Sequence, residues 1–294
     1  MGILLGLIAA LCWGVSDFAA RFAARRVGAY RALFIMQAVG FLLLTGFLES
    51  AGGITRSVAP GARPWLLAGA IGVLNVFASL ALYRSFAIGT MSIVAPISSS
   101  YPAITVALSI LSGERLQAFR AAGLGATFIG VILAAMSFAP RSHASGDSAA
   151  GVPAAHLSSG VGLAIVSACG FGVMFWFLGF HVMPLMGSAV SVWVLRLTGF
   201  GVLALAAWPA RQSVRLPRGS VWWILLLIGV ADTSAFVANN AGLQLGSVSV
   251  VSVLASLYGA VTVLLSWIFL RERLGRSQWL GIALIFAGVV LVSI

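Results

Sequence analysis

Two opposite charges stand in the middle of long apolar segments, Arg196 in WVLRLTGF and Asp232 in GVADTSAF. A charge in the middle of a membrane-spanning segment is costly unless it is paired or hydrated, so we expect these two side chains to face each other. Three roles stay open for such a pair. It could hold two helices together, bind or gate a substrate, or couple to protons through Asp232, although a paired arginine keeps a carboxylate ionised.

A second charged pair lies near the end of the first apolar segment, where Asp17 and Arg21 are four residues apart. This spacing puts both on one helical face, where they can neutralise each other. Trp13 lies one turn earlier on the same face. Mutual neutralisation is the simpler reading, and a role at the mouth of a cavity is the alternative.

Helix-breaking residues interrupt the fourth apolar segment, in which Pro96 and Pro102 flank the polar run SSSY at 98–101. Proline removes a backbone donor and clashes with the carbonyl four residues earlier, so this helix should be kinked or loosened. Gly259, next to Tyr258, is the corresponding weak point in the ninth segment. The alternative is that Ser and Gly only allow close helix packing there.

The composition indicates which kind of structural element carries these residues. The chain has 294 residues, of which 61% are hydrophobic, and a mean hydropathy of +1.10. A soluble domain cannot bury so much apolar surface, and the apolar runs are continuous rather than alternating, which favours membrane-spanning helices. A span needs roughly 20 apolar residues. The chain offers ten: 2–22, 31–50, 64–85, 90–112, 119–138, 159–180, 187–208, 220–241, 246–269 and 277–294.

The formal charge of +11 would suggest nucleic acid as a partner of a soluble protein. Here the basic residues, which are all arginine, fall mainly in the short connections between apolar runs, so they indicate membrane topology and not nucleic-acid binding. The arginine count favours both termini outside the cytoplasm.

The two halves of the chain repeat each other. A shift of 157 aligns 71–109 with 228–266 and gives 15 identities in 39 positions. The polar segment 140–158 reads as a linker, so the predicted repeats are 1–139 and 159–294, with five spans each. An odd number of spans makes the second repeat enter the membrane from the opposite side. The expected fold is therefore an all-α integral membrane protein of ten helices in two inverted five-helix repeats.

Several motifs recur in this frame: Trp13-Gly14 in the first segment, APISSSYPAI in the fourth, and ERL at 114–116 and 272–274. Together they resemble the EamA-type transporters of the drug/metabolite transporter superfamily. The resemblance implies a secondary transporter that exports small metabolites, often amino acids or related compounds. It also implies a central cavity lined by the third, fourth, eighth and ninth helices, and both termini inside the cytoplasm. The second half departs from the pattern with Phe171-Gly172 and Tyr258-Gly259.

On this basis we predict the residues of a central site. Substrate contact is expected from polar and aromatic side chains of the cavity-lining helices: Asn75, Tyr83, Ser99, Tyr101, Asp232, Asn240 and Tyr258. Charge balance or gating is expected from Arg196, Asp17 and Arg21, and helix breaks from Pro96, Pro102 and Gly259. No cofactor or metal is expected. The partners are a small solute and the lipid bilayer, and the location is the bacterial inner membrane.

Two other classes of function could fit this sequence. A passive channel or a lipid or solute flippase could use the same scaffold. An intramembrane enzyme needs a convergent catalytic set, and the sequence offers only Asp17 and Asp232, provided that their helices meet at equal depth. Glu114 and Glu272, each in an ERL loop, are expected at structural corners on opposite membrane faces, with gating as the alternative.

Overall fold

A computed structural model describes residues 1–51, 61–112, 118–137, 156–157, 159–217, 219–245 and 254–293 of the chain. Helices dominate it because the long apolar runs must satisfy their backbone groups internally. In order, the elements of the first half are α1 (Gly2–Val27), α2 (Ala29–Ser50), α3 (Ala62–Ile88), α4 (Met91–Ser98), α5 (Tyr101–Leu111) and α6 (Ala118–Ala135).

The two halves join at β1 (Met136–Ser137) and β2 (His156–Leu157), a short antiparallel pair. The second half continues with α7 (Val161–Phe177), the π-helix η2 (Leu178–Val182), α8 (Met183–Met186), α9 (Ser188–Ala207), α10 (Val221–Leu245), α12 (Tyr258–Leu265), the π-helix η3 (Ser266–Leu270) and α13 (Arg276–Ser293). Most of the predicted linker 140–158, and the start of the predicted ninth span at 246–253, lie outside the described residues.

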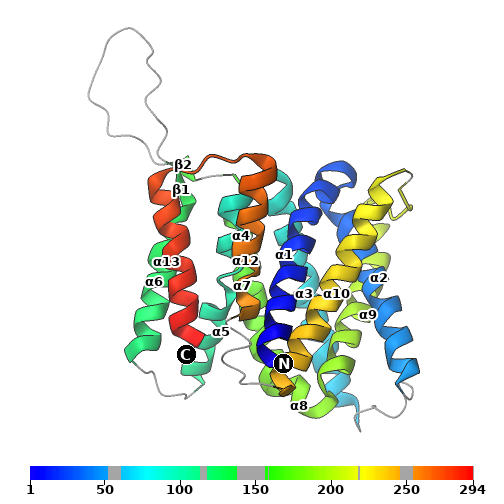
Figure 1. Cartoon of the computed structure of the whole chain (residues 1–294). Helices are drawn as coiled ribbons and strands as arrows, with labels where there is room; N and C mark the ends of the chain where they lie inside the picture. The colour runs from blue at the N-terminus through cyan, green and yellow to red at the C-terminus, as the bar shows by residue number, and fades with distance from the viewer. Residues whose placement is uncertain are drawn as a thin grey trace.

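Six described helical segments are long and apolar enough to cross a membrane: Gly2–Val27, Ala29–Ser50, Ala62–Ile88, Val161–Met186, Ser188–Ala207 and Val221–Asn239. Shorter apolar helices occupy Ala118–Ala134, Leu254–Leu270 and Arg276–Leu291. The predicted helical architecture with membrane-spanning segments is confirmed, and the two-residue strands β1 and β2 depart from the expected all-α fold. Figure 1 shows the helices side by side in one bundle, with both termini at the same end.

The outer faces of this bundle carry large apolar side chains. Leu66, Leu205 and Trp223 are among the exposed ones. A soluble protein rarely exposes contiguous apolar surface of this kind, whereas the lipid tails of a bilayer accept it. These faces therefore fit a lipid environment.

Close helix contacts join the first half to the second. A Cβ atom added at Gly14 of α1 would lie 2.5 Å from Val261 Cβ of α12, and one added at Gly172 of α7 would lie 2.5 Å from Ile104 Cβ of α5. In the first contact the glycine belongs to the first half of the chain, and in the second contact it belongs to the second half. Three further sets of contacts are reciprocal in the same way. Gly40 packs against Arg196, and Gly199 packs against Gln37. Gly72 packs against Thr198 and Gly229 against Val39, and likewise Gly130 packs against Gly281 and Gly288 against Gly123.

Helices α6 and α13 meet along one of these glycine seams, and Figure 1 shows them side by side. A Cβ atom at Gly281 would lie 2.4 Å from the backbone nitrogen of Ala134 and 2.7 Å from the carbonyl oxygen of Gly130. Backbone cannot rotate out of the way as a side chain can. Even one methyl group would therefore push the two helices apart.

The substitution Gly281→Ala should lower the free energy of unfolding by about 1–3 kcal/mol, because the added methyl overpacks a backbone contact. Unfolding of the purified protein in mixed detergent micelles would measure it. Gly125→Ala in α6 is the matched control, since a Cβ there meets nothing within 4 Å. Equal stability of the two variants would contradict the close backbone contact between α6 and α13.

Candidate functional site

A cavity of about 60 Å³ lies between helices of both halves. Its walls come from α1, α2, α3, α5, α7, α9, α10 and α12, so neither half forms it alone. Its lining side chains are mostly aromatic or apolar, with a few polar and charged groups: Trp13, Asp17, Met36, Asn75, Ser79, Leu82, Tyr83, Tyr101, Phe171, Met174, Phe175, Arg196, Asp232, Phe236 and Tyr258. This is the usual composition of a small-molecule site.

Most of the residues predicted from the sequence lie in this cavity. They are Asn75, Tyr83, Tyr101, Asp232 and Tyr258, together with the charged Arg196 and Asp17. Ser99 is buried but is not among the lining residues. The side chain of Asn240 lies outside the part of the chain that the structure describes.

Sequence reasoning missed the contribution of α7, which brings Phe171, Met174 and Phe175 to the cavity. The resemblance had assigned the lining to the third, fourth, eighth and ninth spans only. A signal was present, because Phe171-Gly172 matches Trp13-Gly14 in the repeat and Trp13 also lines the cavity. Aligned aromatic residues of two repeats were thus the better guide.

The central ion pair joins two neighbouring helices, α9 and α10. Arg196 binds Asp232 Oδ2 through Nη2. Its Nη1 donates to Gln37 Oε1 at 3.0 Å, and its guanidinium carbon lies 5.0 Å from the centroid of the Phe236 ring. Only 3% of the Arg196 side chain and 16% of the Asp232 side chain are exposed. The arginine is therefore balanced by a carboxylate, an amide oxygen and an aromatic face.

The expected neutralisation of Asp17 by Arg21 is not what the structure shows. Arg21 Nη1 donates to the carbonyl oxygen of Gly89 at 3.0 Å and pairs with Glu272 Oε1 at 3.2 Å. The long arginine side chain extends away from Asp17, toward the end of α3, where a second carboxylate is available. Asp17 is 92% buried and lines the cavity, and within the described parts of the chain its Oδ2 atom has no hydrogen-bond partner.

Helix α4 ends at Ser98 and α5 begins at Tyr101, so the fourth apolar segment is broken between Pro96 and Pro102. The hydroxyl groups of Ser98, Ser99 and Ser100 donate to carbonyl oxygens three residues earlier, at 3.0, 3.0 and 2.7 Å. The carbonyl oxygens of Ala95 and Ile97 also accept the backbone N–H groups of Ser99 and Ser100, so the hydroxyl groups add to the backbone hydrogen bonding around the break.

A matching interruption precedes α12, which begins at Tyr258 after a turn at Leu257. The two interruptions meet. Tyr101 and Tyr258 stack with ring centroids 6.5 Å apart, and a Cβ at Gly259 would lie 2.2 Å from Ser99 Oγ. Ser99 and Gly259 therefore pack the two broken segments together and bring both tyrosines to the cavity.

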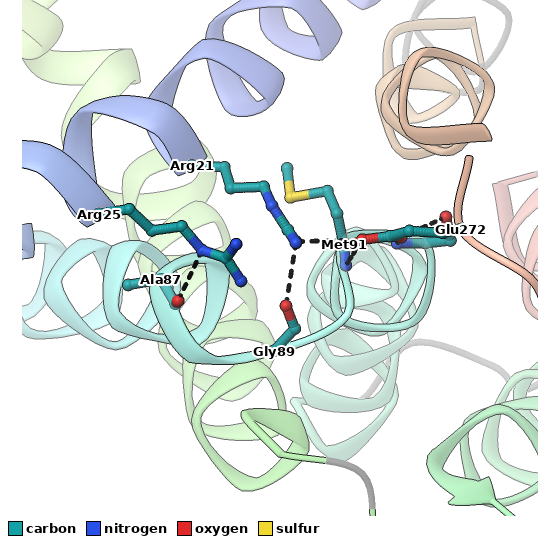
Figure 2. A network of polar contacts seen from close by, with 7 residues as sticks. Arg21, Arg25, Ala87, Gly89, Met91 and Glu272 are labelled. Carbon is teal, nitrogen blue, oxygen red and sulfur yellow. Dashed lines mark hydrogen bonds and ion pairs between the residues drawn. The ribbon is translucent and has the colours of Figure 1, made fainter. Parts of the chain in front are cut away.

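A second polar cluster is formed by Arg21, Met91, Ser92 and Glu272 and is called the Glu272 latch below (Figure 2). Glu272 Oε1 accepts from the Met91 backbone N–H at 3.1 Å. Its Oε2 accepts from the Ser92 backbone N–H at 2.8 Å and from Ser92 Oγ at 2.7 Å. The carboxylate thus caps the first turn of α4, where backbone donors have no partner within the helix.

The Glu272 latch connects the two halves of the chain, since its carboxylate follows η3 and its donors belong to α1 and α4. Neighbouring Arg25 donates through Nε to the Ala87 carbonyl oxygen at 2.9 Å (Figure 2). The other ERL glutamate, Glu114, lies outside the described residues. Glu272 is therefore more than a solvated corner, because only 11% of its side chain is exposed.

The condition for an aspartate-pair enzyme is met in part, because Asp17 and Asp232 line the same cavity. Asp232 is bound by Arg196, however, and a carboxylate held in an ion pair is a poor partner for sharing a proton with Asp17. Among the described residues, no three His, Cys, Asp or Glu side chains are placed to hold a metal ion.

Comparison with known proteins places this geometry in a family. The model of the EamA-like transporter family matches residues 1–136 and 158–294. An uncharacterized transporter in the cobO 3′ region of a Sinorhizobium species is 33% identical over 93 residues, which are 32% of this chain and 64% of that one. A permease-like protein of Bacillus subtilis, YdzE, is 38% identical over 68 residues, or 23% of this chain and 87% of that one.

The fold is also known from experiment. One crystal structure of a protein superimposes on 99% of this chain and 95% of its own, with a TM-score of 0.65 and 19% identity. At this identity the likeness shows the fold alone.

Removing one partner of the central ion pair should be far more harmful than removing both. Arg196→Gln leaves Asp232 as an unbalanced buried charge and should cost about 3–5 kcal/mol of unfolding free energy. The double variant Arg196→Gln with Asp232→Asn should recover most of that loss. Unfolding in mixed micelles would measure both, with the exposed Arg84→Gln as the control. Additive losses in the double variant would contradict the pairing.

Proposed function

Because the chain belongs to the EamA-like transporter family, we propose that it exports a small metabolite across the membrane by alternating access. The observation that carries this proposal is the central cavity, which is built by both halves, has a buried ion pair in its wall and measures only about 60 Å³. Ligand pockets usually occupy about 300–1,000 Å³, so a solute can enter only if the helices move apart.

We further propose that ten helices cross the membrane as two inverted five-helix repeats, 1–139 and 159–294. The reciprocal glycine contacts support this arrangement, since those of Gly14, Gly40, Gly72 and Gly130 in the first half have counterparts at Gly172, Gly199, Gly229 and Gly288 in the second. Both termini at one end of the bundle agree with an even number of crossings (Figure 1). Two related halves around one site are the architecture that can rock between two openings.

We propose that the Glu272 latch closes one end of the route by which the solute reaches the cavity. It ties the α12–α13 connection to α1 and α4 by an ion pair and three hydrogen bonds to one carboxylate. Charge-assisted bonds of this kind are strong but can exchange for water when the helices separate. Such a latch suits a transporter that must open and close the same face repeatedly.

The cavity wall points to the general type of solute. Seven aromatic side chains line it: Trp13, Tyr83, Tyr101, Phe171, Phe175, Phe236 and Tyr258. Aromatic faces bind the apolar body of a solute, and the few polar groups orient it. The proposed cargo is an amphipathic metabolite such as an amino acid or a related compound, and the proposed location is the bacterial inner membrane.

Weakening the Glu272 latch should make the cavity more accessible from the end of the bundle at which the latch lies. Glu272→Gln removes the ion pair and weakens the cap on α4, a loss of about 1–2 kcal/mol, equal to roughly five- to thirtyfold in population. The reporter is Ser79→Cys, in the cavity wall, in a chain whose Cys12 and Cys169 are replaced by alanine. The rate of its reaction with a membrane-impermeant maleimide should rise by that factor.

Arg25→Gln is the matched control for this experiment, because Arg25 lies in the same region but bonds the Ala87 carbonyl oxygen and not Glu272. Its labelling rate should stay that of the parent chain. A labelling rate unchanged by Glu272→Gln would mean that the carboxylate only shapes the turn.

Export itself is tested by mass spectrometry of spent medium from cells that overproduce the chain. Metabolites should accumulate outside these cells and should return to background with equally abundant Asp232→Ala, because this change removes a charged wall residue and unbalances Arg196. Val230→Ala, an exposed position on the same helix, should export normally.

The purified chain, reconstituted into lipid vesicles, can distinguish a transporter from a channel. In proteoliposomes, the exported solute should show saturable flux and counterflow, in which unlabelled solute on one side drives labelled solute across from the other. Flux that rises linearly with concentration and shows no counterflow would favour a channel.

In the export experiment, enrichment of metabolites in the medium that survives Asp232→Ala would leave the ion pair with a purely structural role.

A further inference from the structure

The charges that line the cavity do not cancel. Its described lining contains two carboxylates, Asp17 and Asp232, and one cationic side chain, Arg196. Arg196 is engaged by Asp232 and Gln37, so it neutralises only one of the two. One negative charge remains on Asp17 whenever that carboxyl group is ionised.

Among the described residues that line the cavity, the helices packed against α1 offer Asp17 no cation that is not already engaged. From α10 the cavity receives the carboxylate of Asp232, which carries a like charge. Tyr83 from α3 and Tyr258 from α12 bring phenol groups to the same cavity. Arg21, on α1 itself, is held by Glu272 at the end of the bundle.

The remaining neighbours do not change this balance. Tyr101 of α5 and Arg196 of α9 line the same cavity, and the lining residue from α2 is the uncharged Met36. A buried carboxylate beside a like charge is strongly disfavoured. Asp17 therefore requires one positive charge in the cavity, and that charge can be a proton or part of a bound solute.

The aromatic groups around Asp17 suit a cationic head group. Trp13 lies one helical turn away, with its ring centroid 5.9 Å from that of Tyr258 and 5.1 Å from that of Phe236. Arg196 already lies over the ring of Phe236, which shows that the wall accepts a cation against an aromatic face. A protonated amine next to Asp17 could contact Trp13 or Tyr258 in the same way.

We propose that Asp17 is the counter-ion for the ammonium group of an amphipathic amine, and that the same carboxyl group holds a proton when no amine is bound. Amine binding then displaces the proton, so the two cations exchange at one site. This inference rests on the proposed transport function and narrows its solute class. A carboxylate on the solute finds no unengaged cation among the described lining residues, so amines are favoured over amino acids.

The test uses the full chain in lipid nanodiscs and two probes of equal shape, the cation 2-phenylethylamine and the neutral 2-phenylethanol. Titration calorimetry in two buffers of different ionisation enthalpy measures affinity and proton release together. The amine should bind more tightly than the alcohol and should release a proton. Asp17→Asn, a neutral variant of the same shape, should weaken amine binding about ten- to hundredfold and abolish the release.

Two controls keep the result interpretable. Asp17→Glu retains the carboxylate and should retain tighter binding of the amine than of the alcohol, and unfolding in mixed micelles verifies that Asp17→Asn is folded. The inference is overturned if the intact chain binds the amine no better than the alcohol, or if Asp17→Asn binds it equally well. If either of these results were found while metabolite export is still observed, the transport function would stand and only the role of Asp17 as an amine counter-ion would be rejected.

Discussion

Charge balance inside an apolar bundle is the constraint on which the rest of this structure depends. Lipid cannot hydrate a charge, so each ionised group within the helices needs a partner supplied by the protein or by a ligand. Arg196 meets this condition through Asp232, Gln37 and the ring of Phe236. The helices α2, α9 and α10 are brought together by this one guanidinium group, and the wall of the cavity is formed in the process.

The close approach of the two halves depends on a different property, the absence of side chains at selected glycines. Gly14 and Gly172 admit Val261 and Ile104, and Gly40 admits the side chain of Arg196 itself. Without a hydrophobic driving force between helices in lipid, such close packing supplies much of the association energy. Contacts of this type are also compatible with motion, because rigid helices can tilt about small residues. Polar latches such as that of Glu272 can then decide which end is closed.

The sequence and the structure agree best where the signal is local. The proline pair Pro96 and Pro102 predicts a break, and the structure has one at Ser99 and Ser100. Opposite charges in the middle of apolar segments suggest a pair, and Arg196 and Asp232 form it. The helical spacing of Asp17 and Arg21 was misleading, because an arginine side chain is long enough to choose a carboxylate outside its own helix, here Glu272. Helical spacing says which residues can meet, not which partner is better.

The sequence by itself determined that this chain is a helical membrane protein with two related halves, because hydropathy and repeats are properties of the chain alone. It also indicated seven of the fifteen described cavity residues, among them the charged groups Asp17, Arg196 and Asp232 that lipid would not tolerate. Only the tertiary structure decided that α7 contributes to the wall, that Glu272 caps α4, and that Asp17 Oδ2 is buried without a hydrogen-bond partner among the described residues. Each of these depends on which groups of distant segments come within hydrogen-bonding distance, and the packing of the two halves sets those distances.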